Sequence, residues 1–306
     1  MHEQIESARV RPFSLVLYLL IVFGLSWPFQ FASILWGRTN LPAVFVLNST
    51  AMIMVTVGTY IAGRFVFRDG FAGAGWSWGR PRYYLAVIGL AALLWLVPTG
   101  IDLAAGTLKL PKDFTLLSLI WLFALPVVVL IPGFGEEFGW RGYMLPRLAQ
   151  RMSTRRAVLL HSLIWWAWHL PLVAGGAVTV GIAEARVAHL PVALSIATTV
   201  AAVTLLSIIP AVCHGVVFAY IWTRTQSLAV STVYHAAYDG IRDSLSMIAG
   251  LGPIAGIWAN ALLIILGIVL LWRGDWRNLT TSIERTEPAQ AVSALPAEQA
   301  AGTPQA

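Results

Sequence analysis

Long apolar stretches without a charged residue constrain this chain more than any other feature. The stretch from Leu116 to Phe134 contains no charged residue, and a helix needs about 20 apolar residues to cross a bilayer. Of all 306 residues, 58% are hydrophobic and 11% are charged, whereas soluble domains carry about 25% charged residues. The sequence therefore predicts an all-α fold, a polytopic helical bundle in a membrane.

Eight apolar segments reach or approach the length of a membrane span, which predicts about eight transmembrane helices. We expect residues 1–275 to form one intramembrane domain and the Ala-, Pro- and Gln-rich residues 276–306 to form a disordered tail. The eight segments cover residues 13–36, 41–67, 83–105, 115–138, 157–176, 191–222, 227–248 and 253–272.

Basic residues are distributed unevenly between the two ends of the predicted bundle. Eight alternating spans place 15 of the 20 Lys and Arg on the side that carries both termini. Cytoplasmic loops of membrane proteins carry an excess of Lys and Arg, so we expect both termini and the tail to be cytoplasmic in a multi-pass protein of the cell membrane. The net charge of +6 then follows from the topology. We therefore expect membrane lipids, and no nucleic acid, as partners. The five basic residues on the other side are Arg38, Lys109, Lys112, Arg186 and Arg242.

Three charged side chains follow the apolar stretch in the sequence Glu136-Glu137-Phe-Gly-Trp-Arg141. On a helix Glu137 and Arg141 stand at i,i+4 and can form an ion pair. Glu136 is turned about 100° from that pair and stays free for chemistry. Ionisable groups at membrane depth are candidates for function. The alternative is an ion cluster that only caps a membrane helix at the interface.

Two further pairs of polar or aromatic residues interrupt apolar segments. Trp165 and His169 are spaced i,i+4, so the indole can pack beside the imidazole, and Pro171 loosens the helix next to His169. His235 and Asp239 have the same spacing, which allows a hydrogen bond between them. Counted from the nearest basic residues, all three sets fall about 16–20 Å deep. Separate structural polar residues need not agree in this way, so we expect one shared site.

The three motifs, in this order and spacing, resemble those of the CAAX protease and bacteriocin-processing family, the Abi or type II CAAX prenyl endopeptidases. The resemblance covers residues 115–245. It implies an intramembrane glutamic endopeptidase that acts on membrane-associated or prenylated peptides or proteins. Two residues depart from the family pattern: Trp165 stands for the usual Phe, and Asp239 stands where Asn is common.

The resemblance also implies a role for each residue of the motifs. Glu136 is the general base that activates water, and His169 binds and orients that water. His235 stabilises the oxyanion together with Asp239, which as a carboxylate can only accept hydrogen bonds and so orients His235. The supporting residues are Glu137, Arg141 and Trp165.

Two alternatives to this metal-free enzyme stay open at this point. Glu136, His169 and His235 also match the composition of a zinc site with an open fourth position. We favour no cofactor, because the chain lacks the sequence His-Glu-x-x-His. The other alternative is a membrane protein without catalysis, such as an immunity protein, a chaperone or a transporter, whose polar groups are structural or handle protons.

Overall fold

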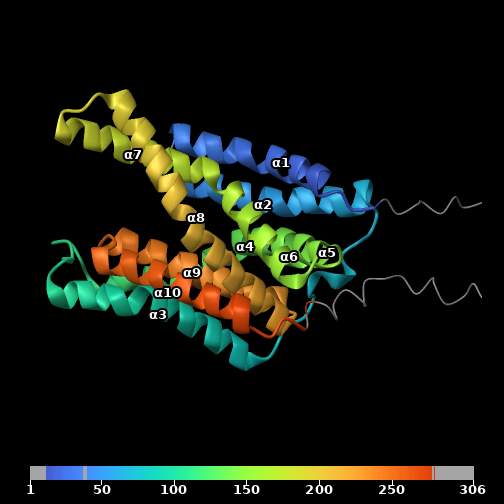
Figure 1. The fold of residues 1–306 in the computed structure, drawn as a ribbon. Coiled ribbons are helices and arrows are strands. Elements are labelled where there is room, and N and C mark those ends of the chain that lie inside the picture. The colour runs from blue at the N-terminus through green and yellow to red at the C-terminus, as the bar shows by residue number, and fades with distance from the viewer. Residues whose placement is uncertain (1–11, 37–39, 278, 280–306) are drawn as a thin grey trace, which may run out of the picture.

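A computed structural model describes residues 12–36, 40–277 and 279. These residues form ten α-helices and short 3-10 or π segments, with no strand among them, which confirms the all-α prediction (Figure 1). The α-helices are α1 (Leu15–Trp36), α2 (Leu41–Ile61), α3 (Pro81–Ala105), α4 (Trp121–Glu137), α5 (Leu145–Ala149), α6 (Thr154–Trp168), α7 (Leu170–Ala188), α8 (Val192–Thr225), α9 (Leu228–Ile248) and α10 (Pro253–Arg273).

Seven helices of the described chain are long and apolar enough to cross a membrane, so the protein is a polytopic helical bundle. α9 is as long as several of them but carries Asp239, Arg242 and Asp243, and it is not among the seven. The segment predicted at 157–176 was wrong as one span, because the chain breaks at His169 into the 15-residue α6 and the longer α7. The seven candidates are Leu15–Trp36, Pro42–Val66, Pro81–Ala105, Leu116–Ala149, Leu170–Ala188, Val192–Thr225 and Pro253–Arg273.

The helices pack in a closed ring around a central space. α1 contacts α2, α2 contacts α4, and α4 contacts α9. The ring continues through α3 and α10 to α8, and α7 closes it by packing on both α8 and α1. α8 crosses between the α1 side of the bundle and the α3, α9 and α10 side (Figure 1). Side chains from most of these helices can therefore meet in the middle of the bundle.

Glycines let α4 lie unusually close to the two helices beside it. A Cβ atom on Gly135 would come within 2.8 Å of the Met52 carbonyl oxygen on α2. On the other side, a Cβ atom on Gly240 of α9 would come within 2.5 Å of the Pro126 backbone. Both distances are too short for any larger residue. Gly135 therefore allows α4 to pack directly against the backbone of α2.

Two irregularities interrupt the helices next to the polar motifs. α4 continues directly into a π-helical segment, η4 (Phe138–Met144), and such segments often occur at functional sites. The Tyr18 hydroxyl donates to the Gly139 carbonyl of this segment at 3.0 Å. The second irregularity is the break at His169, where Pro171 occupies the start of α7. The loosening expected from Pro171 is thus confirmed as a full break between two helices.

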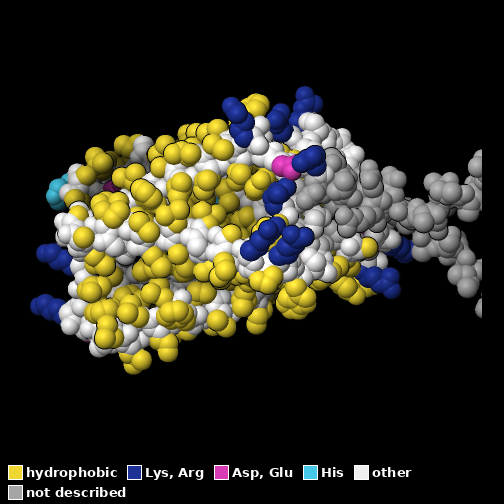
Figure 2. Space-filling model, turned by 90° about the horizontal axis from the view of Figure 1, so that it is seen from below, with side chains coloured by type: hydrophobic (Ala, Val, Ile, Leu, Met, Phe, Trp, Pro, Cys, Tyr) yellow, Lys and Arg dark blue, Asp and Glu magenta, His cyan; other side chains and the backbone are white. Residues whose placement is uncertain are grey.

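The surface of the bundle is largely apolar. Figure 2 shows hydrophobic side chains over most of one face, with most of the visible Lys and Arg toward the end into which α10 runs. Large apolar side chains such as Leu85, Ile131 and Leu206 are more than two-thirds exposed, which in a water-soluble protein would be a liability. The start of α1 and the end of α10 lie at the same end of the bundle (Figure 1). Their cytoplasmic location stays a prediction.

The predicted tail lies mostly outside the described residues. Of its first residues, Trp276 is buried and donates from its indole nitrogen to the Leu270 carbonyl at 3.0 Å. Leu279 is fully buried in the same apolar cluster. The described part of 276–306 therefore packs against the bundle, and the disorder predicted for the rest of the tail stays a prediction.

Candidate active site

The two adjacent glutamates at the end of α4 are both buried, with 2% of Glu136 and none of Glu137 exposed. Oε1 of Glu137 accepts a hydrogen bond from Nη1 of Arg141 at 2.8 Å, as the i,i+4 spacing predicted. Arg141 has no exposed surface, and its guanidinium lies over the rings of Phe218 and Trp165. The pair is therefore fully enclosed by protein.

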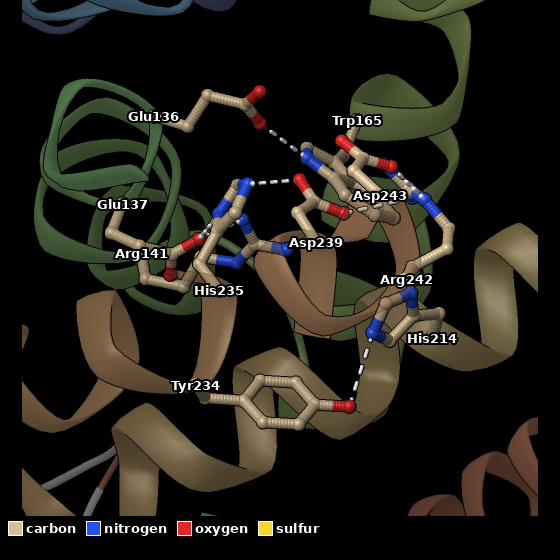
Figure 3. A network of polar contacts seen from close by, with 10 residues as sticks. All are labelled: Glu136, Glu137, Arg141, Trp165, His214, Tyr234, His235, Asp239, Arg242 and Asp243. Carbon is tan, nitrogen blue, oxygen red and sulfur yellow. Dashed lines mark hydrogen bonds and ion pairs between the residues drawn. The ribbon is translucent and has the colours of Figure 1, made fainter. Parts of the chain in front are cut away.

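His235 of α9 is held between two carboxylates (Figure 3). Its Nδ1 lies 2.9 Å from Oε1 of Glu137, and its Nε2 lies 3.2 Å from Oδ2 of Asp239. The contact with Asp239 confirms the predicted pair, whereas the contact with Glu137 was not predicted. An ionised carboxylate only accepts hydrogen bonds, so both ring nitrogens must donate. In this arrangement His235 is a positively charged imidazolium.

Glu136 lies apart from these pairs and contacts a different partner. The indole nitrogen of Trp165 donates to Oε2 of Glu136 at 2.9 Å (Figure 3). Oε1 of Glu136 has no hydrogen-bond partner among the described residues, so one oxygen is held and the other is available. The sequence predicted only that Trp165 packs beside His169, and this contact is confirmed by a ring-centroid distance of 4.7 Å. The hydrogen bond to Glu136 is an additional role that phenylalanine could not fill.

His169 lies at the break between α6 and α7, and the break sets the orientation of its ring. Nδ1 lies 2.8 Å from the carbonyl oxygen of Trp165 and donates to it, because a carbonyl can only accept. A neutral His169 therefore carries its free lone pair on Nε2. No hydrogen-bond partner of Nε2 occurs among the described residues. The imidazole thus has one nitrogen anchored to the backbone and one available to accept a proton or bind water.

All four predicted catalytic residues, Glu136, His169, His235 and Asp239, line one cavity of about 1060 Å³. Residues of α2, α4, α7 and α8 make most of the remaining wall apolar. The four side chains, which the sequence predicted to share one site, thus line the same cavity. Some of the other residues that line it are Phe45, Met52, Leu125, Val129, Leu172 and Leu263.

Several residues of this cavity were not predicted as part of the site. Nη1 of Arg242 lies 2.8 Å from Oδ1 of Asp239, and its Nε lies 2.7 Å from Oδ1 of Asp243. From the distribution of basic residues, Arg242 was expected only to lie on the outer side of the membrane. Its spacing of three residues from Asp239 on one helix was the signal that could have revealed the pair. His214 also lines the cavity, and its Nε2 lies 3.1 Å from the Tyr234 hydroxyl oxygen (Figure 3).

The ion pairs join into one continuous series. It runs Arg141, Glu137, His235, Asp239, Arg242, Asp243, with alternating charges and successive contacts of 2.8, 2.9, 3.2, 2.8 and 2.7 Å. We call these six residues the charge ladder. One end is fully buried, and the other end is partly exposed, with 40% of the Asp243 side chain accessible. The alternation allows several charges to lie in an apolar bundle, because each has an opposite charge beside it.

The predicted zinc alternative requires Glu136, His169 and His235 to converge on one point. Among the described residues, no group of three His, Cys, Asp or Glu side chains is placed to hold a metal ion. His235 also has both ring nitrogens directed at carboxylates and would have to leave one of them. In this arrangement the three side chains do not fit a zinc site.

Comparison with known proteins agrees with the three motifs. Residues 117–241 match the family model described as type II CAAX prenyl endopeptidase Rce1-like. CAAX prenyl protease 2 of Methanococcus maripaludis is 45% identical over 38 residues, which are 12% of this chain and 14% of that protein. The matched region contains all four catalytic candidates and supports a membrane endopeptidase. The resemblance drawn from the motifs is therefore confirmed: residues 117–241 are similar to the Rce1-like type II CAAX prenyl endopeptidases.

Proposed function

We propose that this protein is an intramembrane endopeptidase of the cell membrane in which Glu136 activates a water molecule for attack on a peptide bond. One observation carries the proposal. Glu136 and His169 each have one polar atom fixed by Trp165 and a second polar atom without a partner among the described residues. Both residues line the same cavity. A water molecule held by Oε1 of Glu136 and Nε2 of His169 would have a base and an orienting partner.

The reaction needs only side chains that line this cavity or support it. Glu136 takes a proton from the water as its oxygen attacks the carbonyl carbon, which gives a tetrahedral intermediate with a negative oxygen. His235 stabilises this oxyanion through the positive charge of its imidazolium, while its two N–H groups stay on Glu137 and Asp239. When the carbon–nitrogen bond breaks, the proton on Glu136 passes to the leaving nitrogen. The products are a carboxylic acid and an amine, which ionise to a carboxylate and an ammonium group in water.

Two observations support a membrane-associated substrate with an apolar group. The cavity joins a charged region to a wall made mostly of apolar and aromatic side chains. The matching family is described by its action as a CAAX prenyl endopeptidase. A peptide with an isoprenoid chain near its scissile bond would place that chain on the apolar wall and its peptide carbonyl near Glu136.

The test uses the purified full-length protein in proteoliposomes with a farnesylated, internally quenched peptide that ends in a Cys-aliphatic-aliphatic-X sequence. We expect release of the C-terminal tripeptide by the wild type and none by Glu136→Gln. The same peptide without farnesyl measures the contribution of the isoprenoid chain. Cleavage by Glu136→Gln at the wild-type rate would refute the assignment of the base. Equimolar zinc in active protein, with loss of activity after its removal, would favour the zinc mechanism.

A further inference from the structure

Arg242 and Asp243 are the residues of the charge ladder that the family motifs do not include, and the polar contacts of Arg242 are with carboxylates. Nη1 lies 2.8 Å from Oδ1 of Asp239, three residues earlier on α9. Nε lies 2.7 Å from Oδ1 of Asp243 on its other side. Two edges of the planar guanidinium are thus fixed by two carboxylates, which sets its orientation beside His235.

The two oxygens of Asp239 have separate partners. Oδ1 accepts from Arg242, and Oδ2 accepts from Nε2 of His235. Rotation of the carboxylate out of its present plane would break both contacts, so Arg242 holds the orientation in which Asp239 meets His235. Arg242 also supplies a positive charge beside an aspartate that is 78% shielded from solvent, since 22% of its side chain is exposed. A neutral asparagine at this position would need no such charge and would bring its own acceptor and donors.

We propose that Arg242 is a positioning residue that acts through Asp239 to hold His235 in its working orientation. This inference rests on the proposed function, because His235 is the group whose orientation matters for the oxyanion. Arg242 is 34% exposed at its side chain, and exposed ion pairs contribute little to stability. Replacement of Arg242 should therefore lower kcat strongly and change the unfolding temperature only slightly.

The test is a double-mutant cycle of wild type, Arg242→Gln, Asp239→Asn and the double variant, assayed on the farnesylated quenched peptide. We expect Arg242→Gln to lower kcat roughly 10- to 100-fold, because a small misplacement of a catalytic group can cost about 10². KM and the unfolding temperature should change little. In the Asp239→Asn background, Arg242→Gln should change kcat by less than about threefold, because the group through which it acts no longer needs a cation.

The matched control is Arg186→Gln on α7, an exposed arginine outside the cavity, which removes the same charge. An equal loss of kcat from Arg242→Gln in both backgrounds would overturn the proposal, and so would a rise in KM in place of a fall in kcat. Both results would indicate direct contact of Arg242 with the substrate. An inactive Asp239→Asn variant would also overturn it, because asparagine could then not replace the ion pair. An inactive wild type would instead refute the proposed function itself.

Discussion

Replacement of Glu137 by alanine is the sharpest test of how the charge ladder is held together. Oε1 of Glu137 accepts hydrogen bonds from Arg141 at 2.8 Å and from His235 at 2.9 Å. Neither Glu137 nor Arg141 has any exposed surface. Glu137→Ala therefore leaves a guanidinium enclosed in the protein without its carboxylate, and it removes one of the two carboxylates that hold His235.

The size of the effect follows from this burial. Removal of one partner of a buried ion pair costs about 3–5 kcal/mol. The Arg141 guanidinium keeps its position 4.1 Å from the Phe218 ring centroid and 4.9 Å from that of Trp165. These cation–π contacts persist in the variant. The free energy of unfolding should therefore fall by an amount near the lower end of that range, about 3 kcal/mol. At about 2–4 °C per kcal/mol for chains of this order of size, the unfolding temperature should fall by roughly 6–12 °C.

Thermal unfolding of the purified protein in one detergent measures this change. Glu137→Gln retains an oxygen acceptor, so its unfolding temperature should fall less than that of Glu137→Ala. The matched control is Glu184→Ala on α7, whose carboxylate is exposed and accepts from the Thr199 hydroxyl at 2.7 Å. It should cost about 1 kcal/mol or less. An unfolding temperature for Glu137→Ala equal to that of the Glu184→Ala control would show that Arg141 reaches water, which contradicts its complete burial.

Four further outcomes are expected. His169→Ala should abolish peptide cleavage while the protein still inserts and purifies normally, and cleavage at the wild-type rate would remove His169 from the water site. Asp239→Asn should keep activity within about tenfold of wild type, whereas Asp239→Leu should lose it because leucine offers His235 no acceptor; equal activities would contradict this role. Gly240→Val should lower the unfolding temperature, since its side chain would overlap the Pro126 backbone, and an unchanged temperature would show that α4 and α9 can separate freely. A reporter fused after Ala306 should be active only in the cytoplasm, and activity outside it would reverse the predicted orientation.

The contacts that the sequence predicted correctly are those within a single helix. Glu137 with Arg141 and His235 with Asp239 are each four residues apart, and helix geometry alone brings such side chains together. The contact of Trp165 with His169 belongs to the same class, although the helix ends at Trp168. Local spacing was therefore sufficient to predict these three contacts.

The contacts that the sequence did not predict join different helices. Glu137 and His235 are 98 residues apart, and Trp165 and Glu136 are 29 apart. These pairs depend on how closely and at what depth the helices pack, and packing here depends on close approaches such as that at Gly240. Apolar content in a window cannot reveal such an approach. Apolar content also wrongly predicted one span over residues 157–176, because the sequence stays apolar through His169 although the helix ends there.

The charge ladder also bears on how this protein enters its membrane during synthesis. Asp239, Arg242 and Asp243 lie near the middle of α9, where one charged residue costs about 2.5–3.5 kcal/mol for insertion of a lone helix. Arg242 and His235 together balance the charges of the two aspartates within α9, but the Nδ1–H of His235 has its acceptor, Glu137, on α4. Stable insertion of α9 should therefore wait for contact with α4, a helix made nearly a hundred residues earlier. The insertion machinery would have to keep α4 close until α9 emerges from the ribosome. The polar groups that line the cavity therefore also couple the two halves of the chain during biogenesis.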